Sequence, residues 1–437
     1  MKRIIKLLSL VLCFTMLFTA CGNKETLGEE KARELAGKHI QLFIDGDYDA
    51  VLADCSDAVK KQLDAAALQQ GWQTVVDMTG GVYSGVHEIT YAEQQGMSVV
   101  KTVLNYGSQG LVATFAYDAE GKLGGLNLNV TVLETALTDN DILTEKEITI
   151  GAHRLTGVVT VPDNMENYPV AVLVQGSGAS DYDETIGSNK PFKEIAHYLA
   201  EKGIATVRVN KRFYQKPETA DPETLTIWDE YMDDVYAAID YAKENISDTV
   251  FVIGHSQGGM SAPKIAQDNN LKGIVMMAGT VRGLEDILYD QNAAVILPSD
   301  AYSDREKEEM MNQIGASVQA VKALNENSTD APFGLPASYW LSLRQLDGEN
   351  ILKTTDLPVL VMQGTADFQV YMDKDFEYMQ SLFADRENIS FKSYEGLNHI
   401  FMPQTLPGVT DISEYSAENH IPDYVLQDIA DFICTNK

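Results

Sequence analysis

The residue whose type and setting most clearly indicate chemistry is Ser256. It lies in Gly254-His-Ser-Gln-Gly258, where an apolar run ends and a helical stretch begins. A strand-to-helix turn this sharp needs glycines around the serine and leaves the hydroxyl exposed above the sheet. The N-terminus of the following helix also favours developing negative charge. We therefore predict that Ser256 is a catalytic nucleophile.

A serine nucleophile needs a base, and the base needs a group that orients it. Asp367 and His399 each follow a predicted strand, and they come in the chain order serine, acid, histidine. Asp373 and Asp375 are alternative acids, but they lie deeper in the next predicted helix. His255 lies within the serine turn and is expected to pack sideways. We predict that Asp367 and His399 complete a triad with the serine.

Acyl transfer also requires two backbone N–H groups that bind the negatively charged oxygen of the intermediate. The residue after the nucleophile, Gln257, is predicted to supply one of them. The second is assigned to Ser177, because Gly176 and Gly178 let the backbone approach the reacting carbonyl. The sequence lacks the G-x-G-x-x-G and G-K-S/T patterns of phosphate loops, and it lacks H-E-x-x-H and C-x-x-C. We expect no cofactor and no metal.

These side chains must be positioned by a sheet that is buried on both faces. Within 145–437, short apolar runs without polar alternation are separated by segments of helical period, such as 192–202 and 226–244. The predicted strands are 170–174, 204–209, 249–253, 273–278, 358–362 and 389–394, preceded by a hairpin of 147–150 and 155–161. Such runs are typical of parallel strands covered by helices. We predict an α/β fold with a doubly wound, mostly parallel sheet.

Residues 145–437 resemble the α/β-hydrolase superfamily, in the branch of serine aminopeptidases and dienelactone-hydrolase-like esterases. The resemblance rests on the serine motif and on three further segments, 176–183, 189–192 and 210–212. It implies that the catalytic roles belong to Ser256, Asp367 and His399. Gln175 departs from the pattern, since many members have histidine before the oxyanion glycine. Dienelactone hydrolases proper use cysteine, so the serine argues against that activity.

An insertion at 281–356 separates two of the predicted strands. A helical crossover needs only about a dozen residues, so most of this segment is additional. It contains a predicted helix at 304–324 and an aromatic cluster of Phe333, Tyr339 and Trp340. We expect a helical lid over the carboxyl ends of the strands. Tyr339 and Trp340 would either line the substrate pocket or pack against the domain.

The order of helical and strand-like segments in 31–137 predicts a separate, small α+β domain. Helical segments precede strand-like segments, in the order 29–43, 48–53, 65–78, 98–104, 110–117 and 124–133. The segment resembles the NTF2-like domain of unknown function that precedes hydrolase domains in some bacterial lipoproteins. His39 and His87 have no partners at metal-ligand spacing, so we assign this domain no chemistry.

The first twenty residues have the pattern of a signal peptide. A basic start is followed by an apolar run that is too short to span a bilayer. Small residues before Cys21 resemble a lipobox, which implies that 1–20 are removed, that Cys21 is lipidated and that 21–30 form a tether. The alternative is an ordinary secretory peptide with an incidental cysteine. We expect an exported protein that is held on the outer face of a bacterial membrane by its lipid alone.

Length and charge limit the remaining possibilities. A chain of 437 residues predicts two or three domains. Acidic residues outnumber basic ones by 64 to 33, and a net charge of −31 argues against nucleic-acid binding. Four cysteines do not make a disulfide framework, and a bridge between Cys55 and Cys434 stays open. The sequence does not specify an oligomeric state.

Three functions are compatible with these patterns. The first is a serine hydrolase that cleaves small-molecule carboxylic esters through an acyl-enzyme intermediate. The second uses the same triad on amides, as an aminopeptidase or acyl-peptide hydrolase. The third is a non-enzymatic, ligand-binding lipoprotein in which the hydrolase fold is a scaffold. The intact order of serine, acid and histidine argues against the third.

Overall fold

The computed structural model describes residues 26–61, 63–79, 82–94, 96–106, 109–133, 137–163, 165–406, 408, 412–415 and 417–437. The predicted signal peptide and Cys21 therefore lie outside the described residues. The described chain divides near residue 136 into two compact units, each with its own sheet.

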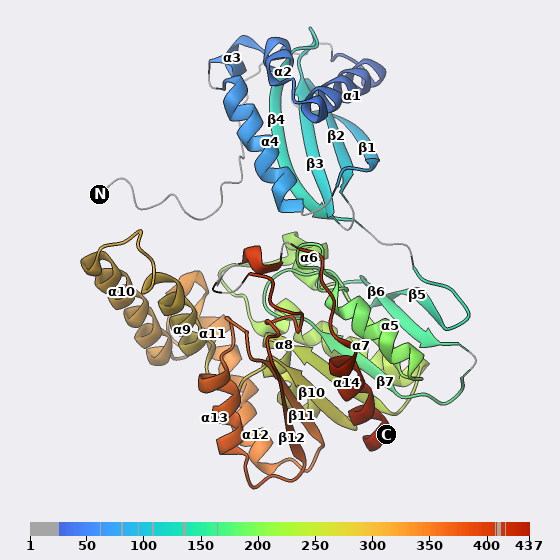
Figure 1. The fold of residues 1–437 in the computed structure, drawn as a ribbon, viewed down its shortest axis with the longest axis vertical. Coiled ribbons are helices and arrows are strands. Elements are labelled where there is room, and N and C mark those ends of the chain that lie inside the picture. The colour runs from blue at the N-terminus through green and yellow to red at the C-terminus, as the bar shows by residue number, and fades with distance from the viewer. Residues whose placement is uncertain are drawn as a thin grey trace. The chain divides into compact units, whose positions relative to one another are not determined.

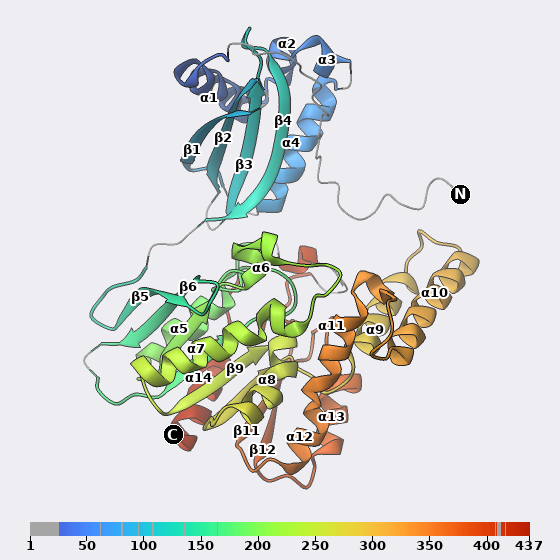
Figure 2. The ribbon, with the colours of Figure 1, turned by 180° about the vertical axis from the view of Figure 1, so that it is seen from behind.

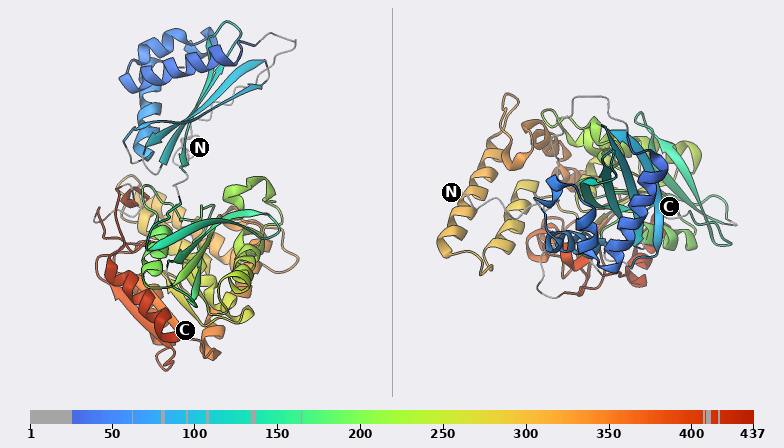
Figure 3. Two further views of the ribbon diagram at one scale, coloured as in Figure 1. Left: turned by 90° about the vertical axis from the view of Figure 1, so that its right-hand side faces the viewer. Right: turned by 90° about the horizontal axis from the view of Figure 1, so that it is seen from above.

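The first unit is a small α+β domain. Its described strands form an antiparallel sheet in the order β1 (Gly85–Gln94), β2 (Met97–Tyr106), β3 (Gln109–Tyr117) and β4 (Leu123–Val132). Its helices are α1 (Glu29–Asp45), α2 (Tyr48–Asp54), α3 (Asp57–Lys60) and α4 (Ala65–Thr79). Helices α1 and α4 pack on the sheet, as the left panel of Figure 3 shows. The core between them is formed by residues such as Phe43, Trp72 and Phe115.

The second unit is built on a mixed sheet. Among the described residues its strand order is β12-β11-β10-β9-β7-β8-β6-β5. The strands are β5 (Leu143–Ile150), β6 (Leu155–Pro162), β7 (Val170–Val174), β8 (Ala205–Val209), β9 (Val250–His255), β10 (Gly273–Met277), β11 (Val359–Gly364) and β12 (Ile389–Tyr394). The hairpin of β5 and β6 pairs antiparallel to β8, whereas the other neighbours are parallel. The predicted hairpin and the six apolar strands are all present.

Helices cover both faces of this sheet. Helices α5 (Pro191–Glu201) and α14 (Asp423–Asn436) lie on the face seen in Figure 1. Helices α7 (Asp233–Asn245) and α8 (Gln257–Asp268) lie on the opposite face (Figure 2). The shorter helices are α6 (Arg212–Gln215) and α13 (Glu377–Leu382).

The segment predicted as one helix at 226–244 is divided in the structure. A π-helical turn, η2 (Trp228–Met232), precedes α7. The Thr226 and Asp229 side chains cap its start, because each accepts a hydrogen bond from the backbone N–H of the other. Turns of this kind are frequent at functional sites, and this one carries Glu230.

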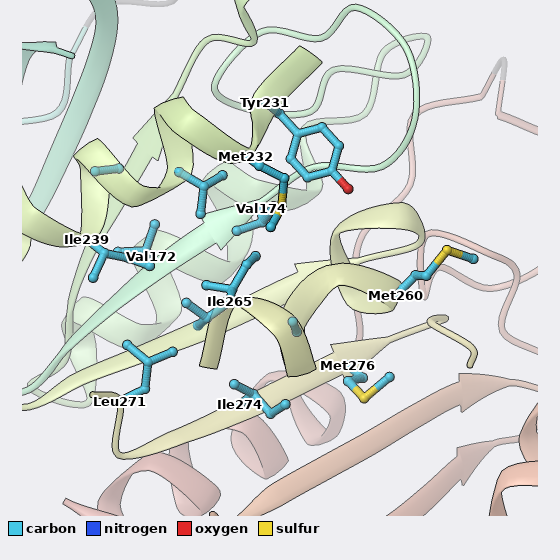
Figure 4. Close-up of a cluster of buried hydrophobic side chains, with 14 of the residues drawn as sticks. Val172, Val174, Tyr231, Met232, Ile239, Met260, Ile265, Leu271, Ile274 and Met276 are labelled. Atoms are coloured by element: carbon cyan, nitrogen blue, oxygen red, sulfur yellow. The ribbon is translucent and has the colours of Figure 1, made fainter. Parts of the chain in front are cut away.

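Apolar side chains hold α8 against the sheet. Figure 4 shows Ile265 of α8 among Val172, Val174 and Ile274 of the strands, all of them buried. Burying one such side chain stabilises a fold by roughly 1.5–3 kcal/mol. The helix that starts after Ser256 is therefore firmly anchored.

The insertion between β10 and β11 is largely helical. It contains α9 (Leu284–Ile296), α10 (Asp304–Ala323), α11 (Ala337–Leu343) and α12 (Gly348–Thr354). Helices α9 and α10 lie side by side at one end of the second unit (Figure 1). Ser303 and Glu306 form a capping box that starts α10.

Candidate active site

Ser256 lies at the tip of the turn between β9 and α8. Its backbone has φ 53° and ψ −115°, a conformation that costs a non-glycine residue about 1–3 kcal/mol. The turn is possible only because the flanking glycines carry no side chain. A Cβ on Gly254 would lie 2.3 Å from the Gly258 oxygen, and a Cβ on Gly258 would lie 2.2 Å from the Val174 oxygen. The structure thus explains the motif by close backbone contacts.

The structure brings the predicted acid, Asp367, next to the predicted base, His399. Asp367 Oδ2 lies 2.7 Å from Nδ1 of His399, and both side chains are buried. The other oxygen, Oδ1, accepts the backbone N–H groups of Gln369 and Val370 at 2.7 and 3.0 Å. Gln363 donates its side-chain amide to Oδ2 at 2.8 Å. The carboxylate is thus fixed by four hydrogen bonds, and it orients the imidazole.

The alternative acid Asp375 has a different partner. It is fully buried, and its Oδ1 lies 3.1 Å from the Arg282 guanidinium. Its other oxygen accepts the Tyr371 N–H at 2.8 Å. Burial raises the pKa of Asp375, although Arg282 opposes this shift. Asp375 thus pairs with Arg282 and the Tyr371 backbone, and it does not orient His399.

The structure brings the His399 ring close to the nucleophile turn. The rings of His399 and His255 are 4.7 Å apart between centroids. Among the described residues, no hydrogen bond joins the Ser256 hydroxyl to His399. Catalytic contacts of this kind are often long before substrate binds and tighten in the complex.

The predicted oxyanion loop passes directly beside Ser256. A Cβ on Gly176 would lie 3.1 Å from the Ser256 Cβ. Within the described chain, the backbone N–H groups of Ser177 and Gln257 donate no hydrogen bond, so both are available to a ligand oxygen. Gln175 donates its side-chain amide to the carbonyl groups of Asp181, at 3.0 Å, and Val209, at 2.6 Å. It therefore holds the loop in the place where the resemblance implies a histidine.

A buried polar network supports this loop. Lys211 Nζ donates to the Gly176 oxygen at 2.8 Å and to Glu230 Oε1 at 2.7 Å. Glu230 Oε1 also accepts the Gly178 N–H at 3.2 Å. The Tyr339 hydroxyl donates to Glu230 Oε2 at 2.6 Å and accepts the Gln257 side-chain amide at 2.8 Å. Burial and the adjacent Glu230 carboxylate raise the pKa of Tyr339, which keeps the phenol protonated.

Sequence reasoning assigned no role to Glu230 and left that of Tyr339 open. Tyr339 comes from α11, so this network ties the insertion to the oxyanion loop. Its neighbour Trp340 points elsewhere: its indole N–H donates to the Pro332 carbonyl at 3.0 Å, and its ring packs with Val321 and Leu324. Trp340 therefore belongs to the packing of the insertion. The lysine lies in the 210–212 segment of the family resemblance.

A second pair that was missed involves His255, expected only to pack sideways. Its Nδ1 lies 2.9 Å from Glu184 Oε1, and its Nε2 lies 3.0 Å from the His399 carbonyl oxygen. Glu184 Oε1 also accepts the Gly176 N–H at 2.6 Å. The loop itself was marked in the sequence by the family resemblance of 176–183, but nothing in the sequence distinguished Glu184.

The described chain shows few other candidate centres. His39 is buried beside Tyr117, and burial lowers its pKa. No group of three potential metal ligands occurs in the part of the chain that the structure describes. No described helix is long and apolar enough to cross a membrane. Cys55 is buried and Cys434 is exposed, and both are free thiols.

Comparisons with known proteins identify the family. A family model described as "Serine aminopeptidase, S33" matches residues 186–403, and a protein family of unknown function, DUF3887, matches residues 36–126. Esterase EstD of Thermotoga maritima is 32% identical over 398 residues, which cover 90% of this chain and 92% of EstD.

Two solved esterases align with a large part of the chain. Est1E from Butyrivibrio proteoclasticus is 16% identical at a TM-score of 0.41, over 66% of this chain and 99% of Est1E. Esterase Pf2001 of Pyrococcus furiosus is 14% identical at a TM-score of 0.42, over 70% of this chain and 96% of Pf2001. The family assignment rests on the similarity to EstD and on the serine aminopeptidase model, which confirm that the protein is an enzyme. The chain therefore belongs to the α/β-hydrolase family that includes Esterase EstD, and it is a serine hydrolase.

Proposed function

We propose that the enzyme cleaves carboxylic esters of small molecules through a triad of Ser256, His399 and Asp367. The observation that carries the proposal is the buried 2.7 Å contact between Asp367 and His399, next to a serine held in a strained turn. The similarity to EstD, which is named an esterase, supports ester rather than amide substrates.

In the first half of the reaction, His399 accepts the hydroxyl proton of Ser256 while the serine oxygen attacks the ester carbonyl. Asp367 orients the imidazole and stabilises the imidazolium that forms. The backbone N–H groups of Gln257 and Ser177 bind the oxyanion. His399 then gives its proton to the departing alcohol, which leaves an acyl group on Ser256.

In the second half, a water molecule gives its proton to His399 and attacks the acyl carbonyl. Collapse of this second tetrahedral intermediate releases the carboxylic acid, and His399 returns the proton to Ser256. The same residues thus act twice, so removing the serine abolishes both half-reactions.

A fluorophosphonate probe tests the assignment. The wild-type protein is expected to be labelled and to hydrolyse short-chain aryl esters, whereas Ser256→Ala loses both activities. Ser256→Ala protein that still hydrolyses the esters would exclude the proposed nucleophile. Comparing thermal unfolding of the two proteins controls for misfolding.

Amide hydrolysis is a second candidate, because the matching family model is described as serine aminopeptidase. Aminoacyl anilides distinguish the two activities on the same preparation. Cleavage of the anilides with no cleavage of the aryl esters would replace the ester assignment by the amide one. The triad chemistry would be unchanged.

The insertion at 281–356 acts as a lid in this proposal. Its support is the hydrogen bond from Tyr339 to Glu230, which anchors α11 beside the oxyanion loop. The boundaries 31–137 for an NTF2-like domain and 145–437 for the hydrolase are part of the same proposal. The DUF3887 match at 36–126 supports a module without assigned chemistry before the enzyme.

Export and lipid attachment at Cys21 complete the proposal. The basic start, the short apolar run and the small residues before Cys21 support a lipoprotein signal at 1–20 and a tether at 21–30. The enzyme would then be held on the outer face of a bacterial membrane. Cys21→Ser is expected to move the protein from the membrane fraction to the soluble fraction, and persistent attachment would contradict the proposal.

A further inference from the structure

The side chains of His255 and Glu184 form a buried pair next to the proposed triad. Each is only 4% exposed. His255 ends β9, immediately before the nucleophile, and Glu184 lies in the loop between β7 and α5. Neither side chain belongs to the triad, yet each one contacts a segment that the mechanism uses.

The contacts of His255 determine its charge. Its Nε2 faces the carbonyl oxygen of His399 at 3.0 Å, and a carbonyl can only accept a hydrogen bond. Its Nδ1 faces a carboxylate oxygen of Glu184 at 2.9 Å. With Glu184 ionised, both partners can only accept, so both ring nitrogens donate, and only the imidazolium carries two N–H groups.

The surroundings of His255 agree with that charge. Burial lowers its pKa, but the Glu184 carboxylate outweighs burial and, together with the more distant Asp367, holds the pKa above its ordinary value. The only other ionisable ring in contact is that of His399, among the described residues. The geometry and the surroundings therefore both favour an ion pair in the folded enzyme.

Glu184 links this imidazolium to the oxyanion loop. Its Oε1 atom accepts both the His255 Nδ1–H and the Gly176 N–H, the latter at 2.6 Å. Oε2 has no hydrogen-bond partner among the described residues, so the pair depends on one shared oxygen. The Glu184 backbone has φ 52°, and its N–H is held by the Asp181 carbonyl at 3.1 Å. Such a backbone costs a non-glycine residue about 1 kcal/mol or more, so the loop is specifically held in this form.

We propose that His255 and Glu184 are positioning residues that fix the main chain of His399 and that of Gly176 to each other. The ion pair thus keeps the general base and the oxyanion N–H groups in fixed positions relative to each other around Ser256. This inference rests on the proposed triad and adds two residues that act through the main chain of His399 and of Gly176.

The test compares Glu184→Gln with a matched control. Glutamine retains an oxygen that can accept the Gly176 N–H, but it removes the charge that keeps His255 doubly protonated. Asp234→Asn is the control, because Asp234 forms a buried pair with Arg212 at 2.9 Å and, among the described residues, makes no hydrogen bond to the His399 loop or the Gly176 loop. Both variants lose one buried charge.

We expect Glu184→Gln to lower kcat on an aryl ester about 10- to 100-fold while KM changes less than about threefold, since a misplaced base and oxyanion hole affect the transition state. Asp234→Asn should keep kcat within about twofold. Rates are expressed per serine that reacts with the fluorophosphonate, so that unfolded protein is not counted. His255→Gln, which retains a donor for the His399 carbonyl but no imidazolium, should show the same loss of kcat.

Proton NMR of protein with ¹⁵N-labelled histidine gives a readout that does not depend on activity. The wild-type enzyme should show two ring N–H signals for His255, assigned by their loss in His255→Gln, and Glu184→Gln should lack one of them. A single N–H on wild-type His255, or a kcat of Glu184→Gln within twofold of wild type, would overturn the inference. Hydrolysis by Ser256→Ala would instead refute the proposed function, so the two failures are distinguishable.

Discussion

The hydroxyl of Tyr339 donates a 2.6 Å hydrogen bond to the buried carboxylate of Glu230. Tyr339 comes from the insertion, whereas Glu230 lies in the π-helical turn before α7. Glu230 in turn accepts the Gly178 N–H of the oxyanion loop. One phenol therefore connects the insertion to the backbone expected to bind the developing negative charge.

Replacing this tyrosine should affect both stability and turnover. Tyr339→Phe removes a donor from a buried carboxylate, which costs about 1–3 kcal/mol. It also frees the Gln257 side chain, so we expect kcat on an aryl ester to fall about 3- to 10-fold. Steady-state kinetics and a thermal melt measure the two effects. Tyr289→Phe is the control, because Tyr289 in α9 is exposed. Equal kcat and equal melting temperatures of the two variants would contradict the role of Tyr339.

The assignment of Asp367 as the acid of the triad can be tested against the alternative acid Asp373. Asp367→Asn should lower kcat by about three to four orders of magnitude, because an amide cannot stabilise the imidazolium and favours the wrong tautomer. Asp373→Asn, at an exposed position, should retain wild-type rates. A loss of activity in the second variant but not in the first would reassign the acid.

The close contacts around the nucleophile turn predict intolerance to a single methyl group. Gly258→Ala would place a Cβ 2.2 Å from a backbone oxygen of Val174, so the turn cannot form without moving β7 or α8. We expect little or no labelling of Ser256 by a fluorophosphonate. In Gly348→Ala the nearest atom to the new Cβ is a Val281 methyl at 3.4 Å, an ordinary contact. That variant should be labelled normally, and normal labelling of Gly258→Ala would show that the turn is more adaptable than the structure indicates.

A buried acid behind the Glu184 loop predicts how stability depends on pH. Glu145 pairs with His197 at 3.0 Å and with the buried Arg208, whose guanidinium also binds Asp183. Burial raises the pKa of Glu145, but the hydrogen bond from His197 and the charge of Arg208 outweigh it and hold the pKa well below its usual range. The stabilisation is therefore fully present above the unfolded pKa of about 4.3, and it is lost as pH falls through the folded value.

Glu145→Gln should then destabilise the hydrolase domain by about 3 kcal/mol at pH 7, and the deficit should shrink at pH 3. Calorimetric melts at the two pH values measure this difference. Glu201→Gln, an exposed substitution, controls for the loss of one negative charge. A deficit that is as large at pH 3 as at pH 7 would show that the carboxylate charge is not its source.

Much of the fold could be predicted because burial on both faces leaves a clear pattern. The continuous apolar runs of β7 and β9 are buried throughout, and such runs indicate central parallel strands. Strand β1 was missed because most of its residues are exposed and it has no hydrophobic alternation. The π-helical turn was missed because its residues continue the helical period of α7.

The catalytic candidates could be predicted because they belong to a motif or follow strands. Their supports could not, since Glu184, Glu230 and Tyr339 are far apart in the sequence and meet only in the folded chain. An acidic residue in a chain with 64 of them carries no signal of its own. Only burial and a specific partner distinguish Glu184 from the acids on the surface.

Because the Ser256 backbone has a positive φ, the reactivity of this serine reports sensitively on whether the hydrolase domain is correctly packed. That conformation is strained, so it persists only while β9 and α8 remain packed. When the packing loosens, the Ser256 backbone relaxes to a common conformation. Its hydroxyl then no longer points at the substrate carbonyl, although the helices are still folded. Inactivation by heat or urea should therefore precede the loss of secondary structure, so that partly damaged enzyme is inactive.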